Sequence, residues 1–307
     1  MSHRFTIVGL GEALFDLLPE GDRLGGAPLN VAVHAHQLAA ARGGRGVIVS
    51  RVGQDDLGQR VYDELRARGM TTDYLQSDPD RPTGTVVVDL VDGSPSYDIV
   101  EDVAWDVIQY DPDLEDLAQH CDAVCFGSLA QRDGQSRNTI YRFLDAAKRA
   151  FKLFDANLRP PFVEPSRLKR SCELADALKL NEDELPQVAE MIGVYEDDAE
   201  ARIAEILKKF DLKMLVLTRG AQGTAIYPAG RDPGEGAIEG EMPEFNPQAD
   251  ADPVGAGDSV SAAILLGRVL RWPPDRIATL ANHVGAFVAG QSGGTPTLPD
   301  ALLERLK

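Results

Sequence analysis

The sequence predicts an α/β fold in which helices cover both faces of a central, mostly parallel sheet and a small β-lid stands at one side. Short apolar runs alternate with helical patterns along almost all of the 307 residues, and repeated strand–helix units build parallel sheets. One β-rich stretch, residues 85–100, interrupts this alternation around Asp92-Gly93, a pair typical of hairpin turns. We therefore expect a single α/β domain over residues 1–307 with an attached lid.

The strands of the central sheet are expected where short apolar runs end in polar turns. They are Phe5–Leu10, Val47–Val52, Ala123–Gly127, Lys152–Asp155, Leu178–Asn181, Met214–Thr218 and Gly223–Tyr227. The lid is expected from residues 12–25 and 83–104, and it contains the strands Thr85–Val91 and Ser96–Val100. Apolar residues occupy both faces of the first of these strands and need cover, so we expect a homodimer in which two lids pack together.

Helices are expected where apolar residues recur every three to four positions, as Leu57, Val61 and Leu65 do. The expected ranges are Pro28–Ala41, Asp56–Arg68, 136–150, 166–177, 182–191, 198–210, 256–270 and 274–289. Ser136 and Ser166 stand where a side chain would cap the first turn of a helix. Residues 229–251 are rich in Gly, Pro and Glu, and we expect them to form an exposed excursion.

The composition disfavours several classes of partner. The chain has 31 Lys and Arg against 49 Asp and Glu, and its formal net charge of −18 disfavours nucleic acid and anionic membranes. No apolar run approaches the roughly 18–20 residues of a membrane span, and no signal-peptide pattern is present. The three cysteines, an odd number, do not indicate a disulfide framework. We expect a cytoplasmic protein that acts on small molecules.

The segment Asp252–Ser259 carries the strongest local signal for chemistry. Gly255-Ala256-Gly257 opens a helix, and its first turn offers unpaired N–H groups and a positive dipole end, an anion hole for a transferring phosphoryl group. Asp258 lies in this turn, where a carboxylate can accept the proton of an attacking hydroxyl. The alternative is an ordinary Gly-rich turn with Asp258 as a helix-starting residue, since short Gly motifs match by chance.

Two spaced motifs resemble those of the ribokinase/PfkB family of carbohydrate kinases. They are Gly25-Gly26-Ala27-Pro28-Leu29-Asn30-Val31-Ala32 and Asp252-Pro253-Val254-Gly255-Ala256-Gly257-Asp258. Four supporting segments follow in the family's order, starting at Gly11, Phe154, Lys179 and Leu217, and Ala39 departs from the pattern, where Gly or Ser is usual. The resemblance implies a ribokinase-like three-layer fold, ATP as phosphoryl donor and Mg²⁺ as the metal, with Asp258 as the catalytic base.

The resemblance also implies where the sugar binds. Asp16 would accept hydrogen bonds from sugar hydroxyls, because a carboxylate can hold two adjacent hydroxyls. Gly25 and Gly26 would form the turn that lets the lid close, with Asn30 just beyond it and within reach of the sugar. Arg159 would balance the charge of a phosphate or a carboxylate.

The nucleotide and metal sites are expected at the ends of later strands. Asn181 and Glu184 resemble the family's Asn-x-x-Glu motif, and their oxygens suit Mg²⁺ held through water. Capping of the following helix is the alternative role for these two residues. The residues expected to contact ATP are Thr218, Gly220, Gly223 and Asn282.

The motifs look most like those of fructokinases, which makes fructose the first candidate substrate. The 2-keto-3-deoxygluconate kinases are the alternative, and their sugar-acid substrate would need a cation such as Arg132, Arg137 or Arg159. Nucleoside kinases fit less well because no base-binding aromatic residues stand out. A reading from another class is a catalytically inactive, sugar-binding relative, but such a protein should lack the base or the anion hole.

Overall fold

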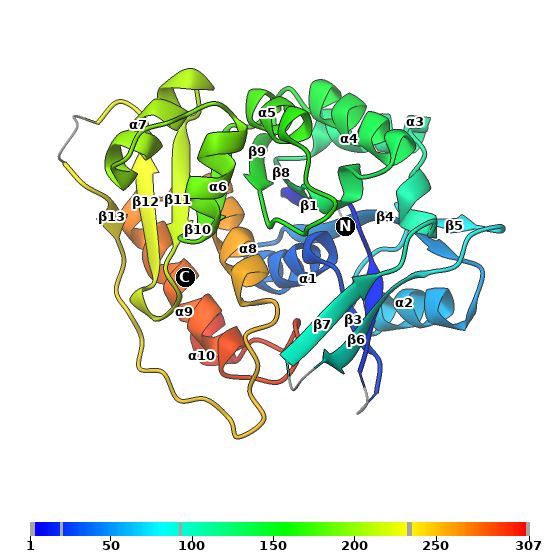
Figure 1. Ribbon diagram of the computed structural model, residues 1–307. Helices are drawn as coiled ribbons and strands as arrows, with labels where there is room; N and C mark the ends of the chain where they lie inside the picture. Colours follow the sequence, from blue (N-terminus) through cyan, green and yellow to red (C-terminus); the bar gives the residue numbers. More distant parts are fainter. Residues whose placement is uncertain (1–3, 19–20, 92–93, 232–234, 305–307) are drawn as a thin grey trace.

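The computed structural model describes residues 4–18, 21–91, 94–231 and 235–304. A nine-stranded sheet forms the centre of the molecule, in the order β13-β12-β11-β10-β9-β8-β1-β4-β5 (Figure 1). Seven strands of this sheet pair in parallel, namely β1, β4, β5, β8, β9, β10 and β11. The strands β12 and β13 add an antiparallel edge. Their bounds are β1 Thr6–Leu10, β4 Arg45–Gly53, β5 Leu75–Asp78, β8 Ala123–Gly127, β9 Phe151–Asp155, β10 Ala177–Asn181, β11 Met214–Thr218, β12 Thr224–Pro228 and β13 Ile238–Glu239.

Helices cover both faces of this sheet, which confirms the predicted three-layer α/β fold (Figure 1). One face carries α1 (Ala27–Ala40), α8 (Ala256–Val269) and α9 (Pro274–Ala289). The other carries α3 (Pro112–His120), α4 (Gly134–Ala146), α5 (Pro165–Leu174), α6 (Glu184–Met191) and α7 (Ala199–Lys209). The remaining helices are α2 (Asp56–Ala67), beside β4, and the short α10 (Asp300–Glu304). No described helix is long and apolar enough to cross a lipid bilayer.

The alternation of side chains along each strand divides the core into two layers. Val8 and Leu10 of β1 point toward α3–α7, while Ile7 points toward α1, α8 and α9. In β8, Phe126 packs in the first layer and Cys125 in the second. Because both faces are covered, these strands are mainly apolar, and the sequence shows them as short apolar runs.

A second sheet of four strands stands beside the central one, in the order β3-β2-β6-β7. Its bounds are β2 Leu14–Leu17, β3 Arg23–Gly25, β6 Gly84–Val91 and β7 Ser94–Ile99. These strands come from the two segments that the sequence analysis assigned to a lid, and we call this sheet the lid sheet. Asp92 and Gly93, the expected turn, lie outside the described residues.

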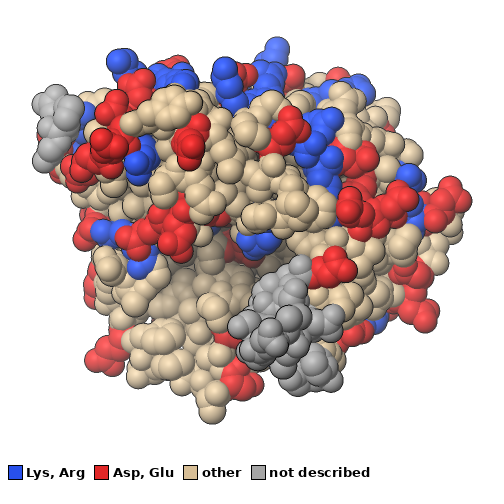
Figure 2. Space-filling view, in the orientation of Figure 1, with Lys and Arg blue, Asp and Glu red and all other residues tan. Residues whose placement is uncertain are grey.

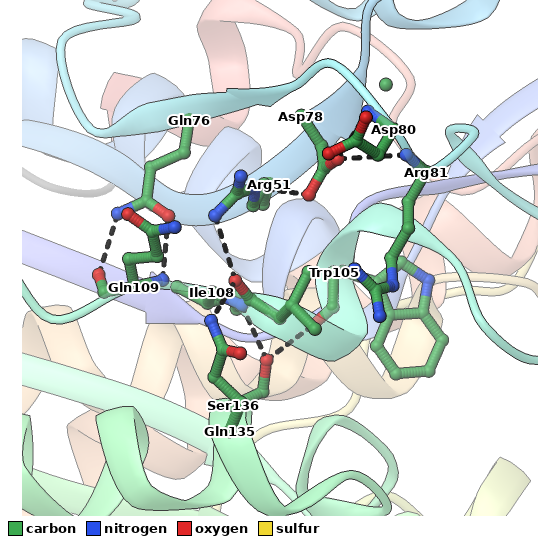
Figure 3. A network of polar contacts seen from close by, with 12 residues as sticks. Arg51, Gln76, Asp78, Asp80, Arg81, Trp105, Ile108, Gln109, Gln135 and Ser136 are labelled. Carbon is green, nitrogen blue, oxygen red and sulfur yellow. Dashed lines mark hydrogen bonds and ion pairs between the residues drawn. The ribbon is translucent and has the colours of Figure 1, made fainter.

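At the foot of the lid, by which we mean residues 105–109 after β7, a polar network joins the chain to β4, β5 and α4 (Figure 3). Arg51 of β4 forms a buried ion pair with Asp78 of β5, with 2.8 Å between Nε and Oδ2, and its guanidinium donates to the Val107 carbonyl at 3.1 Å. Ser136 donates to the Trp105 carbonyl at 2.7 Å and accepts from the Ile108 amide at 2.8 Å. The segment that follows β7 is therefore held between β4, β5 and α4.

The two predicted serine caps are wrong. Asp133 caps α4 instead, accepting from the Gln135 amide at 2.7 Å, and Ser136 lies buried inside the helix. Ser166 is a residue of α5, which follows Glu164 without a side-chain cap. The short helix α3 and the edge strand β5 were not predicted at all. Within the expected excursion, residues 238–239 form β13, and most of the described remainder to residue 251 is exposed.

Candidate active site

A cleft of about 1030 Å³ lies between the lid sheet and the carboxyl ends of the central strands. Figure 2 shows this face of the molecule hollowed beside the lid, with acidic and basic side chains interspersed around it. Ten of the predicted site residues line the cleft: Asp16, Gly26, Asn30, Arg159, Asn181, Glu184, Thr218, Gly255, Gly257 and Asp258. Five others are absent from its described lining: Gly25, Ala256, Gly220, Gly223 and Asn282.

The start of α8 lies at the cleft, where the sequence analysis expected an anion hole. Gly255 precedes the helix with φ of 75°, the left-handed region that favours glycine, and a Cβ there would lie 2.1 Å from the Gly294 carbonyl oxygen. Ala256 and Gly257 are the first two helical residues, and no side chain caps the helix start. The Ala256 amide donates to the Pro253 carbonyl at 3.2 Å, so of these two residues it is Gly257, which lines the cleft, whose N–H is available to an anion there.

Asp258 is buried in the first turn of α8, and its Oδ2 accepts a hydrogen bond from Nδ2 of the Asn30 side chain at 2.8 Å. Burial raises the pKa of Asp258 to about 6, and the nearby Asp155 carboxylate adds to this effect. The Asn30 hydrogen bond and the Lys179 ammonium act in the opposite direction. A carboxylate of this kind is a better proton acceptor than an exposed one, because its basicity is closer to neutral pH.

The structure adds a buried ion pair that the sequence analysis did not assign to the site. Lys179 of β10 donates to both carboxylate oxygens of Asp155 on β9, at 2.9 and 2.8 Å, and Ser261 of α8 donates to the same carboxylate at 2.7 Å. Burial lowers the pKa of Lys179, but the Asp155 carboxylate outweighs it, so the net pKa is raised and the ammonium stays charged. A Cβ on Gly257 would lie 3.5 Å from the Lys179 ammonium. A fixed cation therefore stands beside the anion hole.

Glu12 is a second acid that the sequence analysis left without a role. It lines the cleft, is almost fully buried, and its Oε2 has no hydrogen-bond partner among the described residues. Burial raises the pKa of Glu12 to about 7, although its own backbone amide and Arg159 oppose that shift. A single charged residue between the strand Thr6–Leu10 and the apolar Ala13 was the signal in the sequence that could have identified it.

The lid side of the cleft is built around Asp16 of β2. Its carboxyl is partly buried, and burial raises its pKa against the opposing charge of Arg159. Gly25 lies behind it, since a Cβ there would approach Asp16 Oδ2 to 2.9 Å. Gly26 has φ of 104°, and a Cβ would meet the Glu12 carbonyl at 2.6 Å, so the backbone passes too closely for any other residue.

The comparisons with known proteins identify the family of the chain. Residues 21–301 match the model of the pfkB family of carbohydrate kinases. A fructokinase of Klebsiella pneumoniae is 32% identical over 315 residues, which cover 94% of this chain and 95% of the relative. The chain belongs to the pfkB family of carbohydrate kinases.

Solved structures of similar proteins extend over the whole fold. The fructokinase of Vibrio cholerae O395 in its fructose, ADP and calcium ion bound form has a TM-score of 0.77 at 25% identity, and 99% of each chain is covered. An ATP-bound fructokinase from Xylella fastidiosa has a TM-score of 0.83 at 23% identity, covering 98% of each chain, and shares the fold. As a pfkB-family kinase, this chain is a phosphotransferase whose acceptor is an alcohol.

Of the three arginines considered for a sugar acid, one lines the cleft of the kinase. Arg132 is buried away from it, pairs with Asp106 at 2.7 Å, and stacks over the Trp105 and Phe162 rings. Arg137 donates to the Gln131 carbonyl at 3.0 Å. Arg159 lines the cleft and has no ion pair among the described residues.

Asn181 and Glu184 of the kinase form a reciprocal capping box at the start of α6. The Glu184 amide donates to Asn181 Oδ1 at 2.8 Å, and the Asn181 amide donates to Glu184 Oε2 at 2.9 Å. Glu184 Oε1 also accepts from the Leu158 amide at 2.8 Å. The capping role is thus present, and both side chains still line the cleft.

Of the four residues expected to contact ATP, Thr218 alone belongs to the described lining of the cleft. Thr218 lines it at the end of β11, whereas Gly220 and Gly223 follow in the connecting turn with φ of 52° and 82°. Asn282 of α9 is buried and accepts from the Thr224 amide at 2.8 Å. It also donates to the carbonyls of Gly240 and Glu241, so in this structure it fastens the excursion to β12.

Proposed function

We propose that this kinase transfers the γ-phosphoryl group of ATP to a primary hydroxyl of a small sugar, with fructose as the first candidate. The observation that carries the proposal is the position of Asp258, buried at the open N-terminus of α8 and hydrogen-bonded to Asn30. The fructose and ADP in the Vibrio cholerae relative support this choice of substrates. An inactive sugar-binding relative fits less well, because Asp258, Gly255 and Gly257, the residues proposed as base and anion hole, all line the cleft.

In the proposed reaction, Asp258 accepts the proton of the sugar hydroxyl as its oxygen attacks the γ-phosphorus, and ADP leaves. Asn30 holds the Asp258 carboxylate in place through the 2.8 Å hydrogen bond. The Gly257 amide and the Lys179 ammonium face the charge that grows on the transferring group. Asp16 holds the sugar from the lid side, and Thr218, Gly220 and Gly223 border the ATP phosphates.

Mg²⁺ fits this site only together with the ATP phosphates. Among the described residues, no group of three or more His, Cys, Asp or Glu gathers to hold a metal ion. Asn181 and Glu184 line the cleft with oxygens that keep free lone pairs beyond their backbone hydrogen bonds, and they would hold Mg²⁺ through water. When bound, the ion would neutralise charge on the β- and γ-phosphates.

The charge balance at the sugar end favours a neutral sugar over a sugar acid. Arg23 pairs with Asp252 and Lys179 pairs with Asp155, which leaves Arg159 against Glu12, Asp16 and Asp258, and Glu184 lines the same cleft without an ion pair among the described residues. A carboxylate substrate would add one more acid to this group. This supports fructose ahead of 2-keto-3-deoxygluconate.

A phosphorylation screen tests the proposal. The purified protein is given ATP, Mg²⁺ and, in turn, fructose, other neutral sugars, 2-keto sugar acids and nucleosides, and the phosphorylated product is measured. We expect fructose to have the highest kcat/KM. A sugar acid as best substrate would replace fructose, and binding of a sugar without phosphorylation would favour the inactive relative.

We also propose a homodimer in which two lid sheets pack together. An edge strand such as β7 offers unpaired backbone groups that a second copy can cover. Light scattering at micromolar concentration should give twice the monomer mass, and a monomer mass would reject this assembly.

A further inference from the structure

One ion pair connects the lid sheet to the loop that opens α8. Arg23 of β3 donates to Asp252 Oδ2 at 2.8 Å, although the two residues lie 229 positions apart in the sequence. Arg23 is also the single Lys or Arg in the sequence of the four lid strands. The lid therefore has one basic side chain within its strands, and that side chain reaches the body across the cleft.

On the body side, Asp252 joins two loops of the active site. Its Oδ1 accepts from the Val254 amide at 3.0 Å, inside the loop that leads to Gly255. Its Oδ2 accepts from the Gly293 amide at 3.0 Å, next to the Gly294 carbonyl that lies against Gly255. The position of Asp252 is thus fixed relative to the anion hole.

On the lid side, Arg23 is linked to the residue proposed to hold the sugar. Asp16 and Arg23 are directly opposite each other in the antiparallel pair of β2 and β3. The charge of Arg23 acts on the Asp16 carboxyl, and the charge of Asp252 acts on it in the opposite direction. The Arg23 guanidinium therefore stands between the carboxylate of Asp16, which is proposed to hold the sugar, and the carboxylate of Asp252.

We propose that Arg23 is a positioning residue that holds the lid over the bound sugar and so directs phosphoryl transfer to the sugar rather than to water. The inference rests on the proposed kinase function. A lid that stays closed excludes water from the γ-phosphate and keeps the sugar hydroxyl in line. Both partners are partly exposed, so the pair is weak by itself and acts by favouring the closed position once Asp16 binds the sugar.

The test compares Arg23→Gln with Arg23→Lys. We measure sugar phosphate and ADP formation in the same reaction, together with KM for sugar and for ATP. Arg23→Gln should raise the sugar KM about tenfold and raise several-fold the share of ADP formed without sugar phosphate, while the ATP KM stays within about twofold. Arg23→Lys keeps the charge and should recover most of the loss.

The neighbouring residue offers a matched control. Asp22 pairs with Arg60 of α2 at 3.0 Å, a similarly exposed ion pair that also fastens the lid but is absent from the described lining of the cleft. Asp22→Asn should leave two quantities unchanged: the KM for sugar, and the coupling, by which we mean the share of ADP formation that yields sugar phosphate. If it changes both as much as Arg23→Gln does, general loosening of the lid explains the effect and the inference fails.

A double-mutant cycle identifies the partner. Arg23→Gln and Asp252→Asn should be non-additive, so that the double variant loses no more coupling than Asp252→Asn alone. Additive losses, or an Arg23→Gln variant with the original sugar KM and coupling, overturn the inference while leaving the kinase function intact. A parent protein that phosphorylates no sugar overturns the proposed function, and the inference with it.

Discussion

The kinase contains two buried groups of charges that differ in how acids are balanced. At the foot of the lid, Arg51 pairs with Asp78 and Arg132 pairs with Asp106, one cation for each acid. In the cleft, Asp155 forms an ion pair with Lys179. Asp258 beside them has a hydrogen bond from Asn30 but no ion pair within the described part of the chain.

The direction of the pKa shifts follows from this difference. Burial alone raises the pKa of Asp78, but the amides of Asp80 and Arg81 and the Arg51 charge outweigh it and lower the pKa. Burial raises the pKa of Asp258 to about 6 with the help of another acid. The first arrangement stabilises a fold, and the second keeps a basic carboxylate ready at some cost in stability.

The largest expected effect is that of Asp258→Asn. The side-chain shape and the hydrogen bond from Asn30 are kept, and the proton acceptor is removed. We expect kcat to fall by ~10²–10⁴, the contribution of a positioned base. Thermal unfolding should show no loss of stability, because the variant no longer buries a charge. If the variant keeps most of its kcat on its best substrate, the anion hole alone has to explain the rate.

Asp78→Asn should affect stability and not chemistry. It leaves the Arg51 guanidinium buried without its partner, and breaking such a pair destabilises a protein by about 3–5 kcal/mol. The exposed pair of Arg66 and Asp63 is the control, and Asp63→Asn should cost about 0–1 kcal/mol. Urea unfolding measures both. Equal losses in the two variants would show that the network at the foot of the lid contributes no more than a surface pair.

The two acids should also give opposite pH dependence. Asp258 must lose its proton to act, so kcat/KM should fall about tenfold per pH unit below about 6, and Asp258→Asn should flatten this limb. Because its folded pKa lies above 3.8, the stability that it contributes is present below pH 3.8 and is lost as the pH rises through about 6.

For Asp78 the sign is reversed. Its folded pKa lies below 3.8, so its contribution is present above that value and is lost as the pH falls. Urea unfolding at several pH values between 3 and 7 measures the free energy of unfolding of each variant relative to the parent protein. For Asp258→Asn this difference should become more favourable to the variant as the pH rises. Asp78→Asn should be less stable than the parent near neutral pH, and this difference in the free energy of unfolding should disappear at the lowest pH values. A parallel response of both variants would contradict the assignment of the two groups.

The sequence predicted the parts of the site that depend on local patterns. Gly255, Gly257 and Asp258 lie within four positions at a helix start, so their common place in the cleft was predictable from neighbouring residues alone. Most strands of the central sheet were predictable for the same reason, because burial on both faces makes them short and mainly apolar runs.

What was missed depends on contacts between distant segments. Asp155 and Lys179 meet because β9 and β10 pair in that register, and the sequence does not specify the register. Arg23 and Asp252 meet only after the lid is placed over α8. The edge strand β5 pairs with one neighbour only and ends in polar residues, so it carries little of the apolar signal by which the other strands were predicted.

The smallest expected effect tests whether Glu184 belongs to the fold, to the chemistry, or to both. In Glu184→Gln the carboxamide keeps one oxygen but presents an NH₂ group to a backbone amide, so one capping hydrogen bond is lost, at about 1 kcal/mol. If Glu184 also holds Mg²⁺ through water, the Mg²⁺ concentration for half-maximal rate should rise about tenfold or more. Glu182 is exposed in the same turn, and Glu182→Gln should change neither quantity. A lower melting temperature with an unchanged Mg²⁺ titration would leave Glu184 as a helix cap and remove it from the metal site.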